Sequence, residues 1–187
     1  MRQPVDLPKA YRLLNHGPTV LVSARHGGHH VAQAAAWAMP LDFDPPKVAV
    51  VLDKATYTRE LVEQSNRFAL SVPCQAQARV VHAVGSHSGR GIDKFAECGL
   101  QALEEPAAHS PLVGGCVAWL DCVRLPQPEQ ESRFDLFLGE VTGAWALASV
   151  FTAGRWHFDA QHPELRTLHH IAGGHFFAIG EPVDAGG

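Results

Sequence analysis

Apolar positions along the chain fall into short runs, and glycine, proline or small polar residues separate one run from the next. Runs of this length between turn signals are typical of β-strands. They predict strands over residues 19–24, 31–39, 47–52, 68–72, 117–125 and 134–147. The last run contains Gly139 and Gly143, where we expect bends or bulges. The tail over 168–180 predicts short strand and turn.

Helical spacing is confined to short segments between these runs. It predicts helices over residues 6–16, 58–66, 76–84 and 93–99, with a loop over 85–91 and a connection over 126–132. The first helix begins at Asp6, which can cap it, and Pro8 suits its first turn. All of these helices are short, so none of them dominates the fold.

Short strands with few helices between them predict a mainly β, antiparallel barrel with small helices at its ends. A parallel doubly wound sheet would need a helix after nearly every strand, and several consecutive strands here have none. We see no internal repeat and no linker that would split the chain. We therefore expect a single domain over residues 1–187, with a C-terminal tail at about 181–187.

Composition narrows the class of protein. Hydrophobic residues make up 46% and charged residues 18%, which is typical of an ordinary globular chain rather than a disordered one. The formal net charge of −4 does not favour nucleic acid, whose binders usually carry a basic face. No stretch approaches the roughly 18 apolar residues of a membrane span. The first residues contain no apolar run of a secretory signal, so we expect a cytoplasmic protein.

Cysteine usage agrees with a reducing compartment, and histidine usage raises the question of a metal site. None of the four cysteines forms a CxxC pair, and each lies in or beside an apolar segment, so we expect buried, reduced thiols. Histidine is frequent, with 12 in the chain, and His26, His29 and His30 cluster near a turn. Neither this cluster nor the adjacent His169 and His170 has the spacing of a known zinc site, so we expect no metal.

Three segments carry candidate chemistry, and the first is the alanine-rich run over 34–40. Its alanines leave little side-chain bulk, so a planar ligand could stack against Trp37 with the backbone reading its edge. The alternative is a plain core strand with Trp37 in the core.

The second segment, over residues 53–59, joins a strand to a helix. A helix start offers unpaired N–H groups and the positive end of the helix dipole, so it suits an anion. Thr56 and Thr58 add hydroxyl donors, and Lys54 and Arg59 add charge. The alternative is simple capping, in which one threonine satisfies the helix and the charges face water.

The third segment runs over 86–91 and continues into Asp93, Lys94 and Phe95. Glycines let a backbone approach a ligand closely, and serine and arginine suit a phosphate. The order of residues matches neither a P-loop nor a GxGxxG fingerprint, so neither a nucleoside triphosphate nor a Rossmann dinucleotide site is indicated. The alternative is a flexible polar loop.

Taken together, these segments resemble the flavin reductase-like, FMN-binding split-barrel family, in particular its flavoredoxin-like branch. The resembling residues are 35–50, 54–58, 85–90 with 93–95, 134–141 and 168–174. The resemblance implies a six-stranded antiparallel split barrel of Greek-key type, a homodimer, and one FMN per subunit near the dimer interface. The apolar tail around Ile171, Phe176 and Phe177 is a candidate part of that interface.

The resemblance also implies which residues hold the flavin. The strand with the tryptophan would line the isoalloxazine and ribityl chain, through Ala36, Trp37, Ala38, Met39 and Pro40. The strand-to-helix turn and the serine-rich loop would hold the phosphate, through Asp53, Lys54, Thr56, Thr58, Ser86, Ser88, Gly89, Arg90, Lys94 and Phe95.

The implied activity is that of an oxidoreductase in which NADH or NADPH reduces FMN, and no side chain need act as an acid or base. The alternatives are an electron-transfer flavoprotein served by a redox partner protein, and a non-catalytic flavin-binding dimer. Two departures bear on this choice. Val31 stands where the family often has asparagine, and the stretch over 133–135 lacks a histidine that many NAD(P)H-using members have. We therefore expect direct reduction by NADH or NADPH to be slow.

Overall fold

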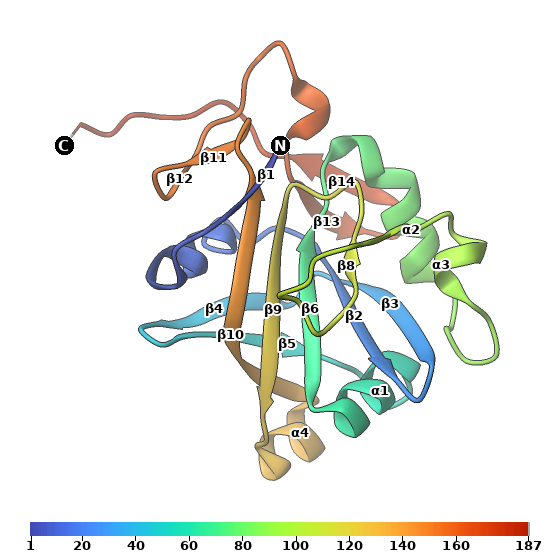
Figure 1. The fold of residues 1–187 in the computed structure, drawn as a ribbon. Helices are drawn as coiled ribbons and strands as arrows, with labels where there is room; N and C mark the ends of the chain where they lie inside the picture. The colour runs from blue at the N-terminus through green and yellow to red at the C-terminus, as the bar shows by residue number, and fades with distance from the viewer. Residues whose placement is uncertain (187) are drawn as a thin grey trace.

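One antiparallel sheet organises the computed structural model, which describes residues 1–186. Its path runs β3-β2-β6-β9-β10-β5-β4. The strands are β2 (Val20–His26), β3 (His29–Ala35), β4 (Ala38–Phe43), β5 (Pro46–Val51), β6 (Arg67–Val72), β9 (Ala118–Leu125) and β10 (Leu136–Leu147). The two ends of the path, β3 and β4, are consecutive in the chain, so the sheet wraps into a barrel that closes at this join (Figure 1).

The predicted mainly β, antiparallel split barrel is confirmed. It has six strands when β3 and β4 count as one bent strand, and a short strand β1 (Arg2–Pro4) adds to β10. The prediction of one unbroken strand over 31–39 is wrong. Ala35 pairs with Val20 of β2, whereas Ala38 pairs with Val50 of β5. The chain therefore turns at residues 36 and 37 and passes from one partner strand to the other.

The expected bulge in β10 is confirmed by a register shift against β9 between Val141 and Gly143. Gly139 of the same strand serves close packing, because a Cβ atom there would lie 2.5 Å from the Phe68 ring. The strand therefore bends at one glycine and admits a core ring at the other.

In the middle of the sheet, along β2, β6 and β9, both faces are buried. Phe68, Leu120 and Phe137 fill the barrel interior, while Leu21 and Trp119 pack in a second core between the outer face and the helices beside it. Residues 119 and 120 of β9 point to opposite cores, as strand alternation requires. Packing on both faces fixes the positions of these strands, and the site lies at the ends of strands of the same sheet.

The described residues contain four α-helices and three short 3₁₀ helices. They are α1 (Tyr57–Ser65), α2 (Ala78–Ser86), α3 (Lys94–Glu97) and α4 (Pro128–Phe134), with η1 (Leu7–Leu13), η2 (Gln75–Gln77) and η3 (Pro163–Leu165). Figure 1 shows α1 and α4 together at one end of the barrel, with α2 and α3 along its side. None of these helices is long and apolar enough to cross a membrane.

Three helix predictions need correction. The first helix is a 3₁₀ helix over Leu7–Leu13, and the Asp6 side chain makes no capping bond. Helix α2 continues through Ser86, so residue 85 does not end it. The expected connection over 126–132 contains α4, which has a proline in its first turn, and its buried Glu131 pairs with Arg124 of β9. That ion pair joins residues seven apart in the chain and ties the helix to the end of β9.

The remaining strands form three small hairpins. They are β7 (Ala102–Leu103) with β8 (Leu112–Val113), β11 (Phe151–Thr152) with β12 (Arg155–Trp156), and β13 (Leu168–Ala172) with β14 (His175–Ala178). The last pair confirms the strand and turn predicted for the tail. Residues 181–186 have neither helix nor strand.

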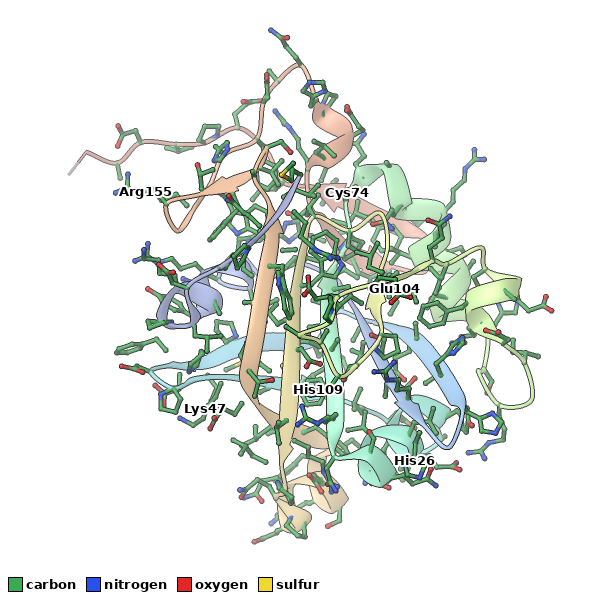
Figure 2. The ribbon with its side chains drawn as sticks, in the orientation of Figure 1. His26, Lys47, Cys74, Glu104, His109 and Arg155 are labelled. Atoms are coloured by element: carbon green, nitrogen blue, oxygen red, sulfur yellow. The ribbon has the colours of Figure 1, made fainter. Side chains whose placement is uncertain are left out.

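Within residues 1–186, the cysteines and histidines form neither a disulfide nor a cluster with the composition of a metal site. All four cysteines are free, and three are buried whereas Cys98 is only partly so. Burial raises the pKa of the Cys116 and Cys122 thiols. Figure 2 shows His26 at the end of the β2–β3 hairpin, and His30 contacts Asp93 at 3.2 Å. Within residues 1–186, no group of three histidine, cysteine or acidic side chains could hold a metal ion.

Candidate functional site

Two adjoining cavities lie at the join where the barrel closes. The larger one has a volume of about 660 Å³ and the smaller one about 200 Å³. They share Gln33, Ala34 and Gly85, so they form two ends of one site. Their combined size is in the range of cofactor-binding pockets.

Six separate segments line the large cavity: the residue before β2, the β3–β4 join, the end of β5 with the turn after it, helix α2, the end of α4 and the β13–β14 hairpin. Its lining residues are Thr19, Gln33, Ala34, Ala35, Ala36, Trp37, Val51, Asp53, Val81, His82, Gly85, Ser86, Phe134, Asp135, His170, Gly173 and Phe176. Most of them are apolar or small. The alanines of β3 and Gly85 of α2 keep the strand and the helix close, because a Cβ atom on Gly85 would lie only 3.4 Å from that of Ala34.

Two exposed aromatic residues stand at the outer end of the large cavity. Trp37 is 74% exposed and Phe134 is 58% exposed. The alternative that Trp37 is a core residue is therefore wrong, because the turn between β3 and β4 carries it out of the barrel. The end of β5 lies between the segment with Trp37 and the segment with Phe134. The Val51 N–H donates to the Trp37 carbonyl (3.0 Å), and the N–H of the next residue, Leu52, donates to the Asp135 carbonyl (2.8 Å).

The small cavity lies at the start of α1. Its lining residues are Gln33, Ala34, Ala55, Thr56, Tyr57, Thr58, Val84, Gly85, His87, Ser88, Gly89 and Lys94. The Thr56 hydroxyl caps α1: it accepts from the Arg59 N–H (3.4 Å) and donates to the Asp53 carbonyl (2.8 Å). Thr56 therefore caps the helix and lines the cavity at the same time, so the two roles that we weighed against each other are both present.

Lys94 places a positive charge inside the small cavity. The side chain is only 3% exposed, and its ammonium donates to the Val84 carbonyl at 2.8 Å. Burial lowers the pKa of this lysine, because the charged form loses water. Asp93 holds the residue in place by capping α3, accepting from the N–H groups of Phe95 and Ala96. A buried ammonium with one protein acceptor is suited to an anion.

Gly89 brings the serine-rich loop against the barrel. It is buried, and a Cβ atom there would lie 2.5 Å from Val31 Cγ2, so any side chain would force the loop outward. Val31 is itself a core residue. The position where the family often has asparagine is thus used here for packing between β3 and the loop.

Gln33 is a site residue that we did not predict. It lies two residues after Val31, on the same face of β3, and lines both cavities. Its Oε1 atom is buried and accepts no hydrogen bond from the described residues. The only local signal is a polar residue inside an alanine-rich strand, and that signal does not distinguish a ligand contact from an exposed strand face.

The structure brings nine of the predicted cofactor residues to the cavities. Thr56, Thr58, Ser88, Gly89 and Lys94 line the small one, and Ala36, Trp37, Asp53 and Ser86 line the large one. Ser86 therefore lies apart from the expected phosphate group, and its hydroxyl donates to the His82 carbonyl at 2.7 Å.

Six predicted residues lie outside both linings: Ala38, Met39, Pro40, Lys54, Arg90 and Phe95. Ala38 points into the barrel core, and Phe95 packs edge-on against the His30 ring. Arg90 pairs with Glu60 at 2.8 Å and lies over the Tyr57 ring, which does line the small cavity.

Arg59 does not supply charge to an anion site. Its guanidinium pairs with Asp135 at 2.6 Å and with Glu63 at 2.8 Å, on the side of α1 that faces α4. Asp135 lines the large cavity, and its carboxylate is held by this ion pair.

Comparisons with known proteins cover nearly the whole chain. The sequence model described as the flavin reductase-like domain matches residues 12–164. A structure described as an FMN-binding domain of a flavin reductases-like enzyme from Shewanella baltica OS155 is 51% identical, with a TM-score of 0.96 over 100% of this chain and 98% of that one. Flavoredoxin of Desulfovibrio vulgaris (Miyazaki F) is 26% identical, with a TM-score of 0.75 over 90% and 89%. The Escherichia coli (strain K12) protein YddH is 44% identical over 186 residues, which are 98% of this chain and 97% of YddH.

Proposed function

The chain belongs to the flavin reductase-like domain family, and on that premise we propose that it is an oxidoreductase that binds one FMN per subunit. The observation that carries the proposal is the pair of joined cavities, one mostly apolar with exposed aromatic rings, the other at a helix start with a buried lysine. A phosphate would lie in the small cavity and the isoalloxazine in the large one. The FMN-binding domain from Shewanella baltica supports the same cofactor.

The residues present fit FMN. The small cavity combines the N-terminal end of α1 with the Lys94 ammonium, and both favour a phosphate dianion. The buried Gln33 Oε1 atom, which has no donor from the described residues, lies between the cavities where ribityl hydroxyl groups would pass. An orphaned buried acceptor is costly, so a ligand that donates to it gains affinity.

When bound, FMN supplies the electron chemistry, and the chain's own residues position and shield it. Lys94 is fixed by Val84 and keeps N–H groups free for a phosphate. Gly85 and Ala34 let a ligand approach the backbone, and Trp37 and Phe134 shield the outer end from water. We assign no side chain as an acid or base.

The source of electrons divides two versions of this function. In the first, NADH or NADPH reduces the flavin directly, as in a flavin reductase. In the second, a redox partner protein does so, as the likeness to flavoredoxin suggests. The lining of the large cavity favours the second, because it contains Asp53 and Asp135 and, within residues 1–186, no lysine or arginine to meet a dinucleotide's phosphates.

We also propose that the chain forms a homodimer in the cytoplasm. Met39, Leu41 and Phe43 of β4 are all exposed, and the register shift between Pro40 and Asp42 puts Met39 and Phe43 on opposite faces of the strand. Among residues 1–186, β4 is an end strand of the sheet and pairs with β5 alone, so a second copy could cover its other edge and these exposed side chains. The free cysteines support a reducing compartment. Light scattering at micromolar concentration should give twice the mass of one chain, and a monomer at every concentration would refute the interface.

The absorbance spectrum of the purified protein tests the function. Protein isolated without added flavin should be yellow, or should take up FMN at about one per chain. Anaerobic mixing of the FMN-loaded protein with NADH, and separately with NADPH, then distinguishes the two versions. Bleaching within a second would establish the reductase, and bleaching only by a reduced partner would establish electron transfer. A protein that takes up no FMN would refute the proposal, and a flavin that no donor reduces would leave a non-catalytic binding dimer.

A further inference from the structure

A third cavity is separate from the two described above. Its volume is about 310 Å³, at the lower end of the range for small-molecule sites. The β2–β3 hairpin forms its first wall and residues 102–111 form its second wall, through Arg25, His30, Ala102, Leu103, Glu104, Glu105, Pro106, Ala108, Ser110 and Pro111. None of these residues lines either of the other two cavities. A ligand bound here would therefore not compete with FMN for the same residues.

Hydrogen bonds within the protein hold the second wall against the barrel. The Asp121 carboxylate, which is fully buried on β9, accepts from the N–H groups of His109 (2.9 Å) and Ser110 (3.1 Å). The Ser23 hydroxyl of β2 donates to the Pro111 carbonyl. Figure 2 shows His109 on this wall, where the chain crosses in front of the sheet. The position of the second wall is therefore set by contacts with two strands of the barrel.

Two opposite charges in the third cavity have no partner among residues 1–186. Of the four ionisable side chains that line it, His30 pairs with Asp93 at 3.2 Å, and Glu105 pairs with an arginine of β1 at 3.0 Å. The other two, Arg25 and Glu104, form no ion pair with each other or with any other described residue. The cavity therefore presents one cation and one anion that a ligand could bridge.

Arg25 and Ser110 are suited to hold a carboxylate. The Arg25 Nε atom donates to the His109 carbonyl at 2.8 Å, whereas its two terminal amino groups donate to no described residue. Parallel N–H groups of a guanidinium match the two oxygens of a carboxylate. Ser110 is only 4% exposed, and its hydroxyl has no hydrogen-bond partner among the described residues. A buried polar atom without a partner is costly, so a ligand that bonds to it gains affinity.

We propose that the third cavity binds a free α-amino acid with an apolar side chain. The carboxylate lies on Arg25, the ammonium lies on Glu104, and the side chain contacts the apolar part of the lining, which includes Leu103, Pro106 and Pro111. An α-amino acid carries its two charges on one carbon atom, so a single small molecule satisfies both charged side chains. A ligand with one charge leaves the other protein charge unpaired. This inference does not depend on the proposed flavin chemistry.

Isothermal titration with three probes that share one side chain tests the proposal. They are L-leucine, which carries both charges, 4-methylpentanoate, which lacks the ammonium, and 3-methylbutylamine, which lacks the carboxylate. Leucine should bind about 10-fold more tightly than the amine, because the amine loses a bidentate contact with a guanidinium. It should bind about 3-fold more tightly than 4-methylpentanoate, the scale of one exposed ion pair.

Charge-removing variants assign each charge of the ligand to a residue. Arg25→Gln should weaken leucine and 4-methylpentanoate about 10-fold and leave the amine unchanged. Glu104→Gln should weaken leucine and the amine about 3-fold and leave 4-methylpentanoate unchanged. Arg155→Gln and Glu129→Gln, at exposed residues outside the lining, are the matched controls and should alter no probe.

Ser110→Ala provides a check that does not depend on Arg25, whose bond to the second wall also supports the structure. It should weaken leucine about 3- to 10-fold. The unfolding temperature of the ligand-free protein should not fall, because the hydroxyl has no partner among the described residues. Full leucine binding in both Arg25→Gln and Ser110→Ala would overturn the proposal.

Three further outcomes would also overturn it. Equal binding of leucine and 4-methylpentanoate would indicate a site for anions in general. Release of FMN by leucine would place the amino acid in the flavin site instead. No binding of leucine at about 10 mM would show that the cavity holds no such ligand. FMN uptake is measured separately, so failure of this inference and failure of the proposed function are distinguishable.

Discussion

The small and the large cavity differ in how they are built. The small one is formed mostly by two stretches of chain, residues 55–58 and 84–94, and it contains a buried charge. The large one draws on six segments and has exposed aromatic rings at its outer end. The small cavity is held by contacts within the protein: a helix cap, a capped α3 and the Lys94 bond to Val84.

The difference suggests a division of work. A preorganised polar cavity binds one chemical group firmly, because little ordering remains when the ligand arrives. An open apolar end with small and aromatic walls admits a ring and leaves room for a second molecule. Affinity for FMN should therefore depend chiefly on the small cavity, and exchange with other molecules on the large one.

The largest expected effect comes from removing the buried charge. Lys94→Met should weaken FMN by about 10- to 150-fold, because a hydrogen bond to a charged group contributes about 1.5–3 kcal/mol. Riboflavin, which lacks the phosphate, should lose much less. Lys54→Met, at an exposed lysine outside the linings, is the matched control. Titration by flavin fluorescence gives both affinities, and equal losses for FMN and riboflavin would show that Lys94 acts on loop structure instead.

Alkaline pH should produce the same effect more gradually. Burial lowers the pKa of Lys94 below the ordinary lysine value, so the ammonium loses its proton at a lower pH than a surface lysine does. A bound phosphate favours the protonated form, so FMN binding should take up a proton and weaken as pH rises through that lowered pKa. Riboflavin has the same ring, including an N–H that ionises at alkaline pH, so it serves as the control: FMN affinity should fall further than riboflavin affinity over this range. Equal profiles for the two flavins would contradict a lysine–phosphate contact.

Gln33 joins the two cavities, and its removal should have effects of opposite sign. Gln33→Leu should weaken FMN by about 3- to 10-fold, the worth of one neutral hydrogen bond. The flavin-free protein should become no less stable, because the variant removes a buried acceptor that has no donor from the described residues. Thermal unfolding with and without FMN measures both effects, with Gln64→Leu on an exposed part of α1 as control. Loss of stability without flavin would mean that Gln33 supports the strand rather than the ligand.

The smallest expected effect is at Arg90. Its side chain is 61% exposed and already paired with Glu60, so Arg90→Ala should weaken FMN less than about 3-fold, the scale of an exposed ion pair. The motif alone would rank this arginine above Lys94. A loss as large as that of Lys94→Met would mean that Arg90 leaves Glu60 and turns to the phosphate when the cofactor binds.

Sequence patterns predicted the residues of the small, polar cavity better than those of the large, apolar one, for a physical reason. Caps and glycine-rich loops are encoded within a few residues, so Thr56, Gly89 and Lys94 could be found from their neighbours. Whether Trp37 is exposed depends on the change of pairing partner from β2 to β5, which no local pattern records.

Arg59 is a case in which a local pattern predicted a role that a distant residue prevents. It follows a strand-to-helix turn, where a positive charge is typical of an anion site, yet its partner Asp135 lies 76 residues further along the chain. Helix α4 was missed for a different reason. Its proline in the first turn was interpreted as part of a connection, and its buried Glu131 pairs with Arg124 at the end of β9, seven residues earlier in the chain.

The central claim is that the two cavities together hold a single FMN, with its phosphate in the small one. Parallel titrations of the flavin-free protein with FMN and with riboflavin test it most directly. Two or more charge-assisted contacts predict FMN binding at one per chain and about 100-fold or more tighter than riboflavin. Equal affinity for the two flavins, or uptake of neither, would contradict the account.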